Sequence, residues 1–433
     1  MNQPFASRLG LVCCLITLSL SGDNWPAWRG ADGLGIVKDG PIPLHWGAQE
    51  NVKWKAALPA PGNSTPVVWG DCVFVTQANP KTNERMLMCF DRGDGALKWK
   101  SGVVYDKPET THRTNPYCAA SPVTDGERVV VTFASAGVFC FDFEGNEVWR
   151  RDLGPQVHEW GNASSPVLYQ GLCLLYHGPG EGAAIVAMDK NTGRTVWTYQ
   201  EPAFVPGPRT DGFKGRESGG MIGSFSTPLL IKVAGQEELV MSFSQRVQGL
   251  NPLTGKLLWN CEGLNPLIYT SPIFGENKIV CMGGFKGTTI ALQAGGRGDI
   301  SESHLLWEAV ATKNRLGCGI IYEGAIYVVN MDGIAQCLDL ASGEEIWEER
   351  VEAAGADGTS WSSMILAGEH LLVPNKSGDV VVLKASKNFD QVAVNSLGET
   401  MNSSIAVSDG ELFIRTDKHL WCLGQAGDKV AAR

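Results

Sequence analysis

The ten residues LDLASGEEIW, Leu338 to Trp347, decide the fold because near copies of them recur along the chain. In each copy an aspartate or asparagine begins a turn, a glycine follows, and a tryptophan stands four residues after the glycine. The five copies are Gly95 to Trp99, Gly145 to Trp149, Gly193 to Trp197, Gly255 to Trp259 and Gly343 to Trp347. Because aspartate caps tight turns and glycine adopts positive φ, each copy predicts a β-hairpin whose second strand carries the tryptophan.

A second motif lies upstream of each hairpin and is followed by a short apolar pair, a turn and an alternating run. It reads STP at Ser64, ASP at Ala120, SSP at Ser164, STP at Ser226 and TSP at Thr270, with weaker relatives at Trp361 and Asn402. One unit therefore contains four short strands, and units of this kind at a period of about 40 to 50 residues are typical of β-propeller blades.

The repeat predicts an all-β fold, an eight-bladed propeller of four-stranded antiparallel blades. Inner strands are expected near residues 64, 120, 164, 226, 270, 318, 361 and 402. The last unit lacks an outer strand, whereas the strand around Trp54 has no blade before it, so we expect this N-terminal strand to complete the last blade and close the ring. Seven blades is the alternative, because the stretch from Leu383 to Leu397 has neither the glycine nor the tryptophan.

The tryptophans of the repeat are predicted to pack between neighbouring blades, where large side chains bury best. These structural positions are Trp54, Trp99, Trp149, Trp197, Trp259, Trp307 and Trp347. The propeller is expected over residues 51–424, preceded by an N-terminal segment, 22–50, and followed by a tail, 425–433. The aromatics of the N-terminal segment, Trp25 and Trp28, are expected to brace the outside of the ring, or alternatively to present a surface to a peptide-like partner.

Composition and the N-terminus indicate an exported protein that does not bind nucleic acid. Of the 433 residues 43% are hydrophobic and 19% charged, and the net charge of -10, with no basic cluster, opposes binding to phosphates. Arg8 precedes an apolar run, Leu9 to Ser21, which predicts a signal peptide over 1–21 and hence a periplasmic or extracellular location. After cleavage no transmembrane span is expected.

The cysteines indicate neither a disulfide framework nor a metal site. Of the 12, Cys13 and Cys14 lie in the signal peptide, and ten remain. Cys89, Cys140 and Cys337 occupy the slot that Ala187 fills in another repeat, which predicts a tight, buried position for a small apolar side chain. No metal is expected, because no cysteine or histidine spacing suits zinc.

The repeat resembles the PQQ-like β-propeller family, best in MDKNTGRTVW and LDLASGEEIW, over roughly residues 50 to 424. That family contains quinoprotein dehydrogenases and a non-enzymatic branch that includes the envelope assembly factor BamB. The motif is structural, so the resemblance by itself implies a blade type and not an activity.

The dehydrogenase chemistry that the resemblance could imply finds little support. The alcohol dehydrogenases of the family hold their quinone beside adjacent, ring-joined cysteines, but the adjacent cysteines here are Cys13 and Cys14 of the signal peptide. There is no C-x-x-C-H, G-x-S-x-G or H-E-x-x-H motif, so catalytic residues stay unassigned. No cofactor is expected, and PQQ with calcium enters only under an alternative hypothesis of an oxidoreductase with a site on the axis.

Long polar loops before the inner strands are the expected place for a site, because they open onto one face of the ring and its axial channel. The candidate residues on these loops are His112, Arg113, His158, Glu159, Trp160, Arg209, Arg216, Glu217, Arg315 and Trp361. Loop histidines, ion pairs and packing tryptophans would look the same in sequence, so only convergence in space would favour a site. The sequence thus predicts a binding or scaffolding module for a protein partner or a small ligand, with a BamB-like assembly factor as a further alternative.

Overall fold

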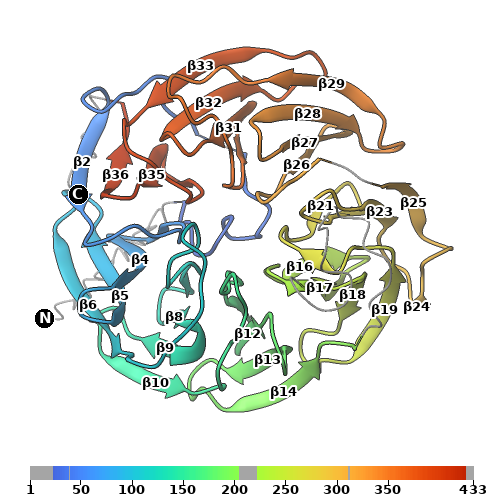
Figure 1. Cartoon of the computed structure of the whole chain (residues 1–433), viewed down its shortest axis with the longest axis horizontal. Helices are drawn as coiled ribbons and strands as arrows, with labels where there is room; N and C mark the ends of the chain where they lie inside the picture. Colours follow the sequence, from blue (N-terminus) through green and yellow to red (C-terminus); the bar gives the residue numbers. More distant parts are fainter. Residues whose placement is uncertain (1–22, 39, 204–221, 311–312, 426–433) are drawn as a thin grey trace, which may run out of the picture.

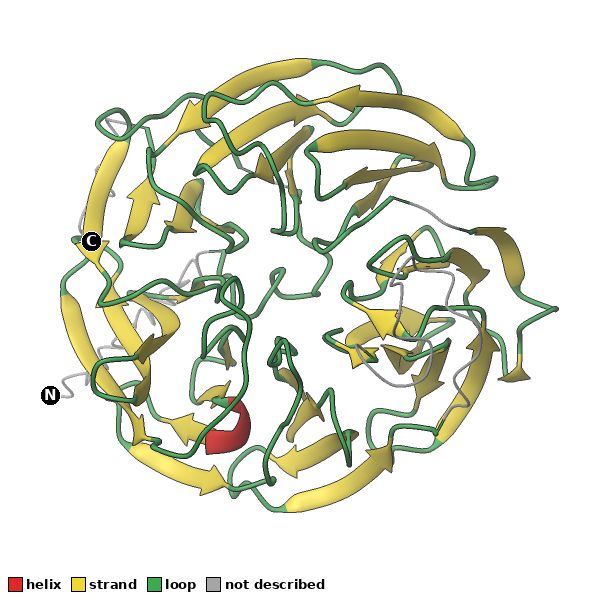
Figure 2. Cartoon of the chain, in the orientation of Figure 1, coloured by secondary structure: helices red, strands yellow, loops and turns green. Residues whose placement is uncertain are grey.

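Eight antiparallel sheets stand around one axis and form a closed ring (Figure 1). The computed structural model describes residues 23–38, 40–203, 222–310 and 313–425. In this part of the chain the only helix is one 3-10 turn, Ala134–Ala136, and all other regular structure is β (Figure 2). The all-β, eight-bladed fold predicted from the repeat is confirmed, and the seven-bladed alternative is wrong.

Each blade runs from an inner strand at the axis to an outer strand at the rim. Blade 1 is β3 (Val67–Trp69), β4 (Cys72–Asn79), β5 (Glu84–Asp91) and β6 (Leu97–Val104). Blade 2 is β7 (Val123–Thr124), β8 (Val129–Thr132), β9 (Val138–Phe141) and β10 (Glu147–Arg151). Blade 3 is β11 (Val167–Tyr169), β12 (Leu172–His177), β13 (Ala184–Asp189) and β14 (Thr195–Gln200). Blade 4 is β16 (Leu229–Val233), β17 (Gln236–Phe243), β18 (Arg246–Leu250) and β19 (Leu257–Glu262).

The second half of the ring repeats this order. Blade 5 is β21 (Ile273–Gly275), β22 (Lys278–Met282), β23 (Thr289–Gln293) and β25 (Leu305–Ala309). Blade 6 is β26 (Ile320–Tyr322), β27 (Ala325–Val329), β28 (Ile334–Asp339) and β29 (Glu345–Arg350). Blade 7 is β30 (Ile365–Ala367), β31 (His370–Pro374), β32 (Asp379–Lys384) and β33 (Gln391–Ser396). Blade 8 is β34 (Ala406–Ser408), β35 (Glu411–Arg415) and β36 (His419–Leu423), with β2 (Val52–Ala57) outermost.

The ring closes through β2, as the repeat predicts. This N-terminal strand pairs antiparallel with the C-terminal β36, with Trp54 opposite Cys422. Nearer the axis, the buried guanidinium of Arg415 donates from blade 8 to blade 1, to the Oγ of Ser64 and to the Oε1 of Gln77, both at 2.6 Å. Closure therefore joins the two ends of the chain through a strand pair at the rim and a hydrogen-bonded arginine inside.

Four short strands lie outside the four-stranded pattern. β1 (Ile36–Val37) adds parallel to β30 of blade 7, and β24 (Gly298–Asp299) adds parallel to the outer strand β19. β15 (Gly223–Ser224) and β20 (Leu267–Ile268) form a separate two-stranded parallel sheet. These additions come from the N-terminal segment and from the longer connections around blades 4 and 5.

Most of the repeat tryptophans pack on the turn glycine of the next blade. Trp149 is typical, since its indole Nε1 donates to the carbonyl of Lys190 at 2.8 Å and its ring would lie 2.6 Å from a Cβ placed on Gly193. Trp54, Trp99, Trp197 and Trp307 make the same pair of contacts, and the indole of Trp347 donates to the carbonyl of Ser386 in blade 7. The aspartate that opens each hairpin accepts backbone N–H groups of its own turn, as Asp339 does from Ala341 and Ser342.

Trp259 departs from this pattern. Its indole is 1% exposed and donates to the Oε2 of Glu238 at 2.7 Å, within its own blade. The ring lies against Gly249 of β18, where a Cβ would come 2.1 Å from the indole nitrogen. The hairpin of the following blade is lengthened and contributes β24, so Trp259 meets no turn glycine of the kind that Trp149 meets.

The N-terminal segment crosses the axial channel, so the expectation that it braces the outside of the ring is wrong (Figure 1). Trp25 pairs with Val68 of blade 1 through two backbone hydrogen bonds of 2.9 Å. Arg29, 2% exposed, donates to the carbonyl of Gly319 in blade 6 at 2.8 Å. Further along, the carbonyl of Gly35 accepts from Leu366 of blade 7. The segment thus ties blade 1 to blades 6 and 7.

Residues 1–22, on which the predicted signal peptide lies, fall outside the described residues. All ten described cysteines are buried free thiols. Those of the recurring slot are 0% exposed, as is Ala187 in the third repeat, which agrees with a tight position for a small apolar group.

Candidate functional site

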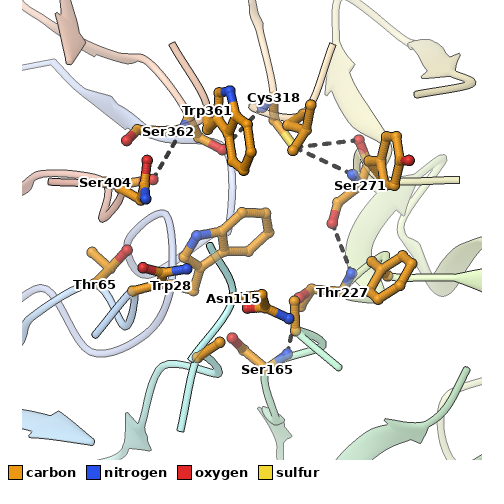
Figure 3. A pocket seen from close by; sticks show the side chains of 18 of the residues that line it. Trp28, Thr65, Asn115, Ser165, Thr227, Ser271, Cys318, Trp361, Ser362 and Ser404 are labelled. Carbon is orange, nitrogen blue, oxygen red and sulfur yellow. Dashed lines mark hydrogen bonds between the residues drawn. The ribbon is translucent and has the colours of Figure 1, made fainter. Parts of the chain in front are cut away.

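A cavity of about 370 Å³ lies on the propeller axis (Figure 3). Its floor is formed where each inner strand begins, and its wall is formed by the loops that lead into these strands. Trp28 of the N-terminal segment lines both this cavity and a second one of about 150 Å³, between the segment and the inner strands of neighbouring blades. The segment therefore closes the channel on one side and turns it into a cup, which we call the axial cup.

The floor of the axial cup is a ring of one side chain per blade. Its members are Thr65, Ser121, Ser165, Thr227, Ser271, Cys318, Ser363 and Ser404. The backbone N–H of each donates to the side-chain oxygen or sulfur of the next, through seven hydrogen bonds of 2.7 to 3.2 Å from Thr65 to Ser404. We call this set the hydroxyl ring. It fixes the eight blades at the axis and aligns their polar groups around one cavity.

Aromatic rings form much of the wall above the hydroxyl ring. Trp160 stacks on Tyr269 with ring centroids 5.5 Å apart and planes 24° apart, and Phe225 contacts Tyr269 at 5.8 Å. Trp361 lies on the opposite side, and Figure 3 shows its indole directed toward the centre, above Trp28. Large apolar surfaces with a few fixed polar groups are the usual composition of small-ligand sites.

His158 holds the backbone of Trp160 through a hydrogen bond. The backbone N–H of Trp160 donates to the Nδ1 of His158 at 3.2 Å, and the Nε2 of His158 lies 3.1 Å from the carbonyl of Ile222. The neutral imidazole with its proton on Nε2 satisfies both contacts. Burial lowers the pKa of His158 below its usual value and outweighs the opposing effects of the Ile222 carbonyl and of Glu159.

The predicted site residues fall into three groups. His112, Trp160 and Trp361 line the axial cup. His158 and Glu159 lie beside the cup, and Arg113 is exposed and does not line it. Arg315 is 2% exposed, and its guanidinium donates to the side chain of Gln336 at 2.7 Å inside the ring. Arg209, Arg216 and Glu217 lie outside the described residues.

Sequence reasoning missed two parts of the cup. The STP-like motif predicts only the start of an inner strand, although its second residue recurs as serine or threonine and supplies the hydroxyl ring. Trp28 is expected on the outside because the N-terminal segment belongs to no repeat. The hydroxyl ring could have been found from the hydroxyl side chain that recurs at one position of the motif. For Trp28, no pattern within the N-terminal segment indicates a place at the axis.

The described residues of the cup do not fit PQQ with calcium. None of its described lining residues carries a carboxylate, a guanidinium or an ammonium group. Calcium takes oxygen ligands that usually include carboxylates, and a quinone bearing three carboxylates needs cationic or convergent N–H partners. Among the described residues, no three or more His, Cys, Asp or Glu side chains gather where a metal ion could bind. Within the same residues, no helix is long and apolar enough to cross a membrane.

Comparisons with known proteins agree on the type of propeller. The profile of the family described as outer membrane protein assembly factor BamB matches residues 83–349 and 299–430. The assembly factor BamB of Burkholderia pseudomallei is 22% identical over 307 residues, which cover 68% of each chain.

Solved structures share the fold at low sequence identity. BamB from Moraxella catarrhalis superposes with a TM-score of 0.59 at 12% identity, over 85% of this chain and 98% of that one. A europium-containing methanol dehydrogenase superposes with a TM-score of 0.64, also at 12% identity, over 90% of this chain and 89% of that one. A protein named as an assembly factor and one named as a dehydrogenase thus share this architecture, so the fold alone does not distinguish between the two roles.

Proposed function

Because this chain belongs to the family of the outer membrane protein assembly factor BamB, we propose that the protein is a non-enzymatic binding module and that the axial cup is its ligand site. The apolar run at residues 9–21 supports export, and we place the module in the cell envelope or outside it.

The chemistry of the cup carries this proposal. Hydroxyl, amide and aromatic groups converge there, whereas its described lining offers no carboxylate to act as a general base beside a substrate. Aromatic walls and fixed hydrogen-bonding groups supply affinity and orientation. A binding role uses all of these groups, whereas a dehydrogenase role would need acid-base and cofactor-binding partners that the described lining residues do not supply.

Titration with PQQ, in the presence and absence of calcium, tests the proposal. We expect no stoichiometric binding heat, and no PQQ-dependent oxidation of ethanol or glucose by the same preparation. Calcium-dependent binding at one site per chain that is lost in Trp361→Ala would contradict a non-enzymatic role, because it would place the quinone in the cup.

A second candidate function is assembly of outer membrane proteins, as in the name of the family, through an outer strand at the rim of the propeller. The outer strand β14 reads TVWTYQ, contains no charged residue, and leaves Val196 54% exposed. No further strand of the described chain pairs with it. By contrast, β6 carries Lys98 and Lys100, and charges on an edge strand discourage added strands. The β14 edge could therefore hold an extended strand of an outer membrane protein during assembly.

Photo-crosslinking distinguishes this second function from the first. A photoreactive residue at position 196 should capture an unfolded β-barrel protein added to the purified chain, and the same residue at position 97 on β6 should capture much less. Equal capture at the two positions would argue against strand addition at β14.

A further inference from the structure

The hydroxyl ring accepts hydrogen bonds from the protein but leaves its own hydrogens available. Each of Ser121, Ser165, Thr227, Ser271, Ser363 and Ser404 accepts one backbone N–H. None of these hydroxyls donates to another described residue. Because a hydroxyl has one donor in addition to its lone pairs, the floor of the cup presents several O–H donors around one axis.

Two acceptors without a partner complement these donors. The Oγ of Ser362 is in a residue only 3% exposed, and neither it nor the Oδ1 of Asn402 has a hydrogen-bond partner among the described residues. Both residues line the cup, on the side of blades 7 and 8. A buried polar atom without a partner costs about 1–3 kcal/mol, so a ligand that satisfies both would gain from contacts that the protein itself leaves unmade.

Trp361 borders these two residues and offers an aromatic face. The Nζ of Lys376 lies 4.9 Å from the centroid of its ring, which occupies one face of the indole. The indole also lines the cup and points toward its centre, near Trp28 (Figure 3). The negative face of an aromatic ring attracts weakly polarised C–H groups, so this wall suits a ligand with an apolar face.

We propose that the axial cup binds the end of a neutral carbohydrate, an inference that rests on the proposed role of the cup as a ligand site. A sugar ring combines C–H faces, which stack on indoles, with many hydroxyl groups that both donate and accept. The O–H donors of the floor and the acceptors on Ser362 and Asn402 match that distribution. The described lining residues carry no carboxylate, guanidinium or ammonium group, which matches a neutral ligand. An aromatic side chain of a peptide would fill the same walls but would leave most of the ring donors and both acceptors unsatisfied.

The test uses the full chain with three neutral trisaccharides, maltotriose, cellotriose and tri-N-acetylchitotriose, measured by calorimetry and by tryptophan fluorescence. We expect at least one to bind at one site per chain, and trigalacturonate to bind at least about tenfold more weakly because no cation is found among the described residues that line the cup. Trp361→Ala should weaken binding about tenfold or more, and Trp361→Phe should restore much of the loss. Ser362→Ala and Asn402→Ala should each weaken binding severalfold. Tyr169→Phe should leave binding unchanged, because Tyr169 ends the inner strand β11 and does not line the cup.

Several outcomes would overturn the inference, and they separate it from the function on which it rests. Absence of binding by all three trisaccharides, with a tryptophan-containing tripeptide binding in a manner lost in Trp361→Ala, would reject the carbohydrate and keep the binding module. Saccharide binding that Trp361→Ala leaves unchanged, in a variant with an unaltered melting temperature, would place the sugar elsewhere. Calcium-dependent PQQ binding in the cup would reject both.

Discussion

The backbone N–H of Ser271 donates to the thiol sulfur of Cys318 at 3.2 Å, whereas the six other junctions of the hydroxyl ring use a hydroxyl oxygen. Blade 6 is therefore joined to blade 5 by the weakest acceptor of the set, because sulfur accepts hydrogen bonds poorly. Both residues are buried, so loss of this bond would leave a buried N–H without its protein partner.

Removal of that acceptor should destabilise the ring. Cys318→Ala should lower the free energy of unfolding by about 1–2 kcal/mol, because the N–H of Ser271 loses its partner in a buried place. Cys318→Ser, which restores the hydroxyl of the other blades, should stay within about 0.5 kcal/mol of the wild-type protein. Urea unfolding followed by fluorescence measures both, and equal losses in the two variants would show that packing of the sulfur matters more than its bond.

The contact of each indole with a turn glycine gives a second prediction. Gly193 has φ of +69°, and a Cβ there would meet the ring of Trp149 at 2.6 Å. Gly235 has a similar φ of +81° but open space around it. Replacement of either glycine by alanine should lower the free energy of unfolding by about 1–2 kcal/mol through backbone strain alone. Gly193→Ala should lower it by roughly 2 kcal/mol more, because the indole of Trp149 must shift.

Gly235→Ala is thus the matched control, since it has the backbone strain without the contact. The difference between the two melting temperatures measures the interblade packing alone. Similar melting temperatures would mean that the indole of Trp149 can move aside without loss.

The repeat predicted the parts of the molecule that every blade must reproduce. A blade can bury its faces only against its neighbours, so the turn and the tryptophan have to recur, and from them followed the number of blades and the closing strand. Trp259 shows the limit of this reasoning. Its spacing from Gly255 is that of the other copies, but its surroundings depend on the length of the hairpin in the next blade, which its own unit does not encode.

The site was predictable to a smaller degree for a related physical reason. Loops before the inner strands must converge on the axis, so His112, Trp160 and Trp361 could be named from sequence. Trp28 could not, because the course of the N-terminal segment is fixed by hydrogen bonds to backbone groups of distant blades. Backbone carbonyls occur at every residue, and a sequence gives no sign of which ones will receive a donor.

Protonation of His158 should weaken the structure around the cup. Its pKa is lower in the folded protein than the usual value of about 6.5, so between these two values the unfolded chain binds a proton that the folded chain does not. The contribution of His158 to stability is therefore constant above about pH 6.5 and falls as the pH drops below it, by at most about 1.4 kcal/mol per pH unit. A proton on Nδ1 would also displace the N–H of Trp160.

His158→Gln removes this titration. The variant should lose less stability than the wild-type protein between pH 6.5 and pH 5, in urea unfolding measured at each pH. Other groups also titrate in this range, but they are common to both proteins and cancel in the difference. Parallel curves for the two proteins would show that His158 does not titrate differently on folding.

Arg29 should hold the N-terminal segment in the channel. Its guanidinium donates to carbonyls of its own segment, at Gly33 and Leu34, and to those of Cys318, Gly319 and Met364 in the ring. Arg29→Ala leaves the three buried carbonyls of the ring without this donor, so we expect the free energy of unfolding to fall by about 2–4 kcal/mol and the segment to be released from blade 7.

Hydrogen exchange locates that loss. In the folded protein the amide N–H groups of Leu366 and Gly368 donate to the segment, at Gly35 and Val37. In Arg29→Ala these two amides should exchange faster, while amides within the central strands of the other blades keep their protection, because opening is local. Arg150→Ala is the control, since this arginine pairs at the surface with Glu147. Uniformly faster exchange across all blades would mean instead that the segment is needed for the stability of the whole ring. Arg29 would then stabilise the propeller as a whole and not only the segment that closes the cup.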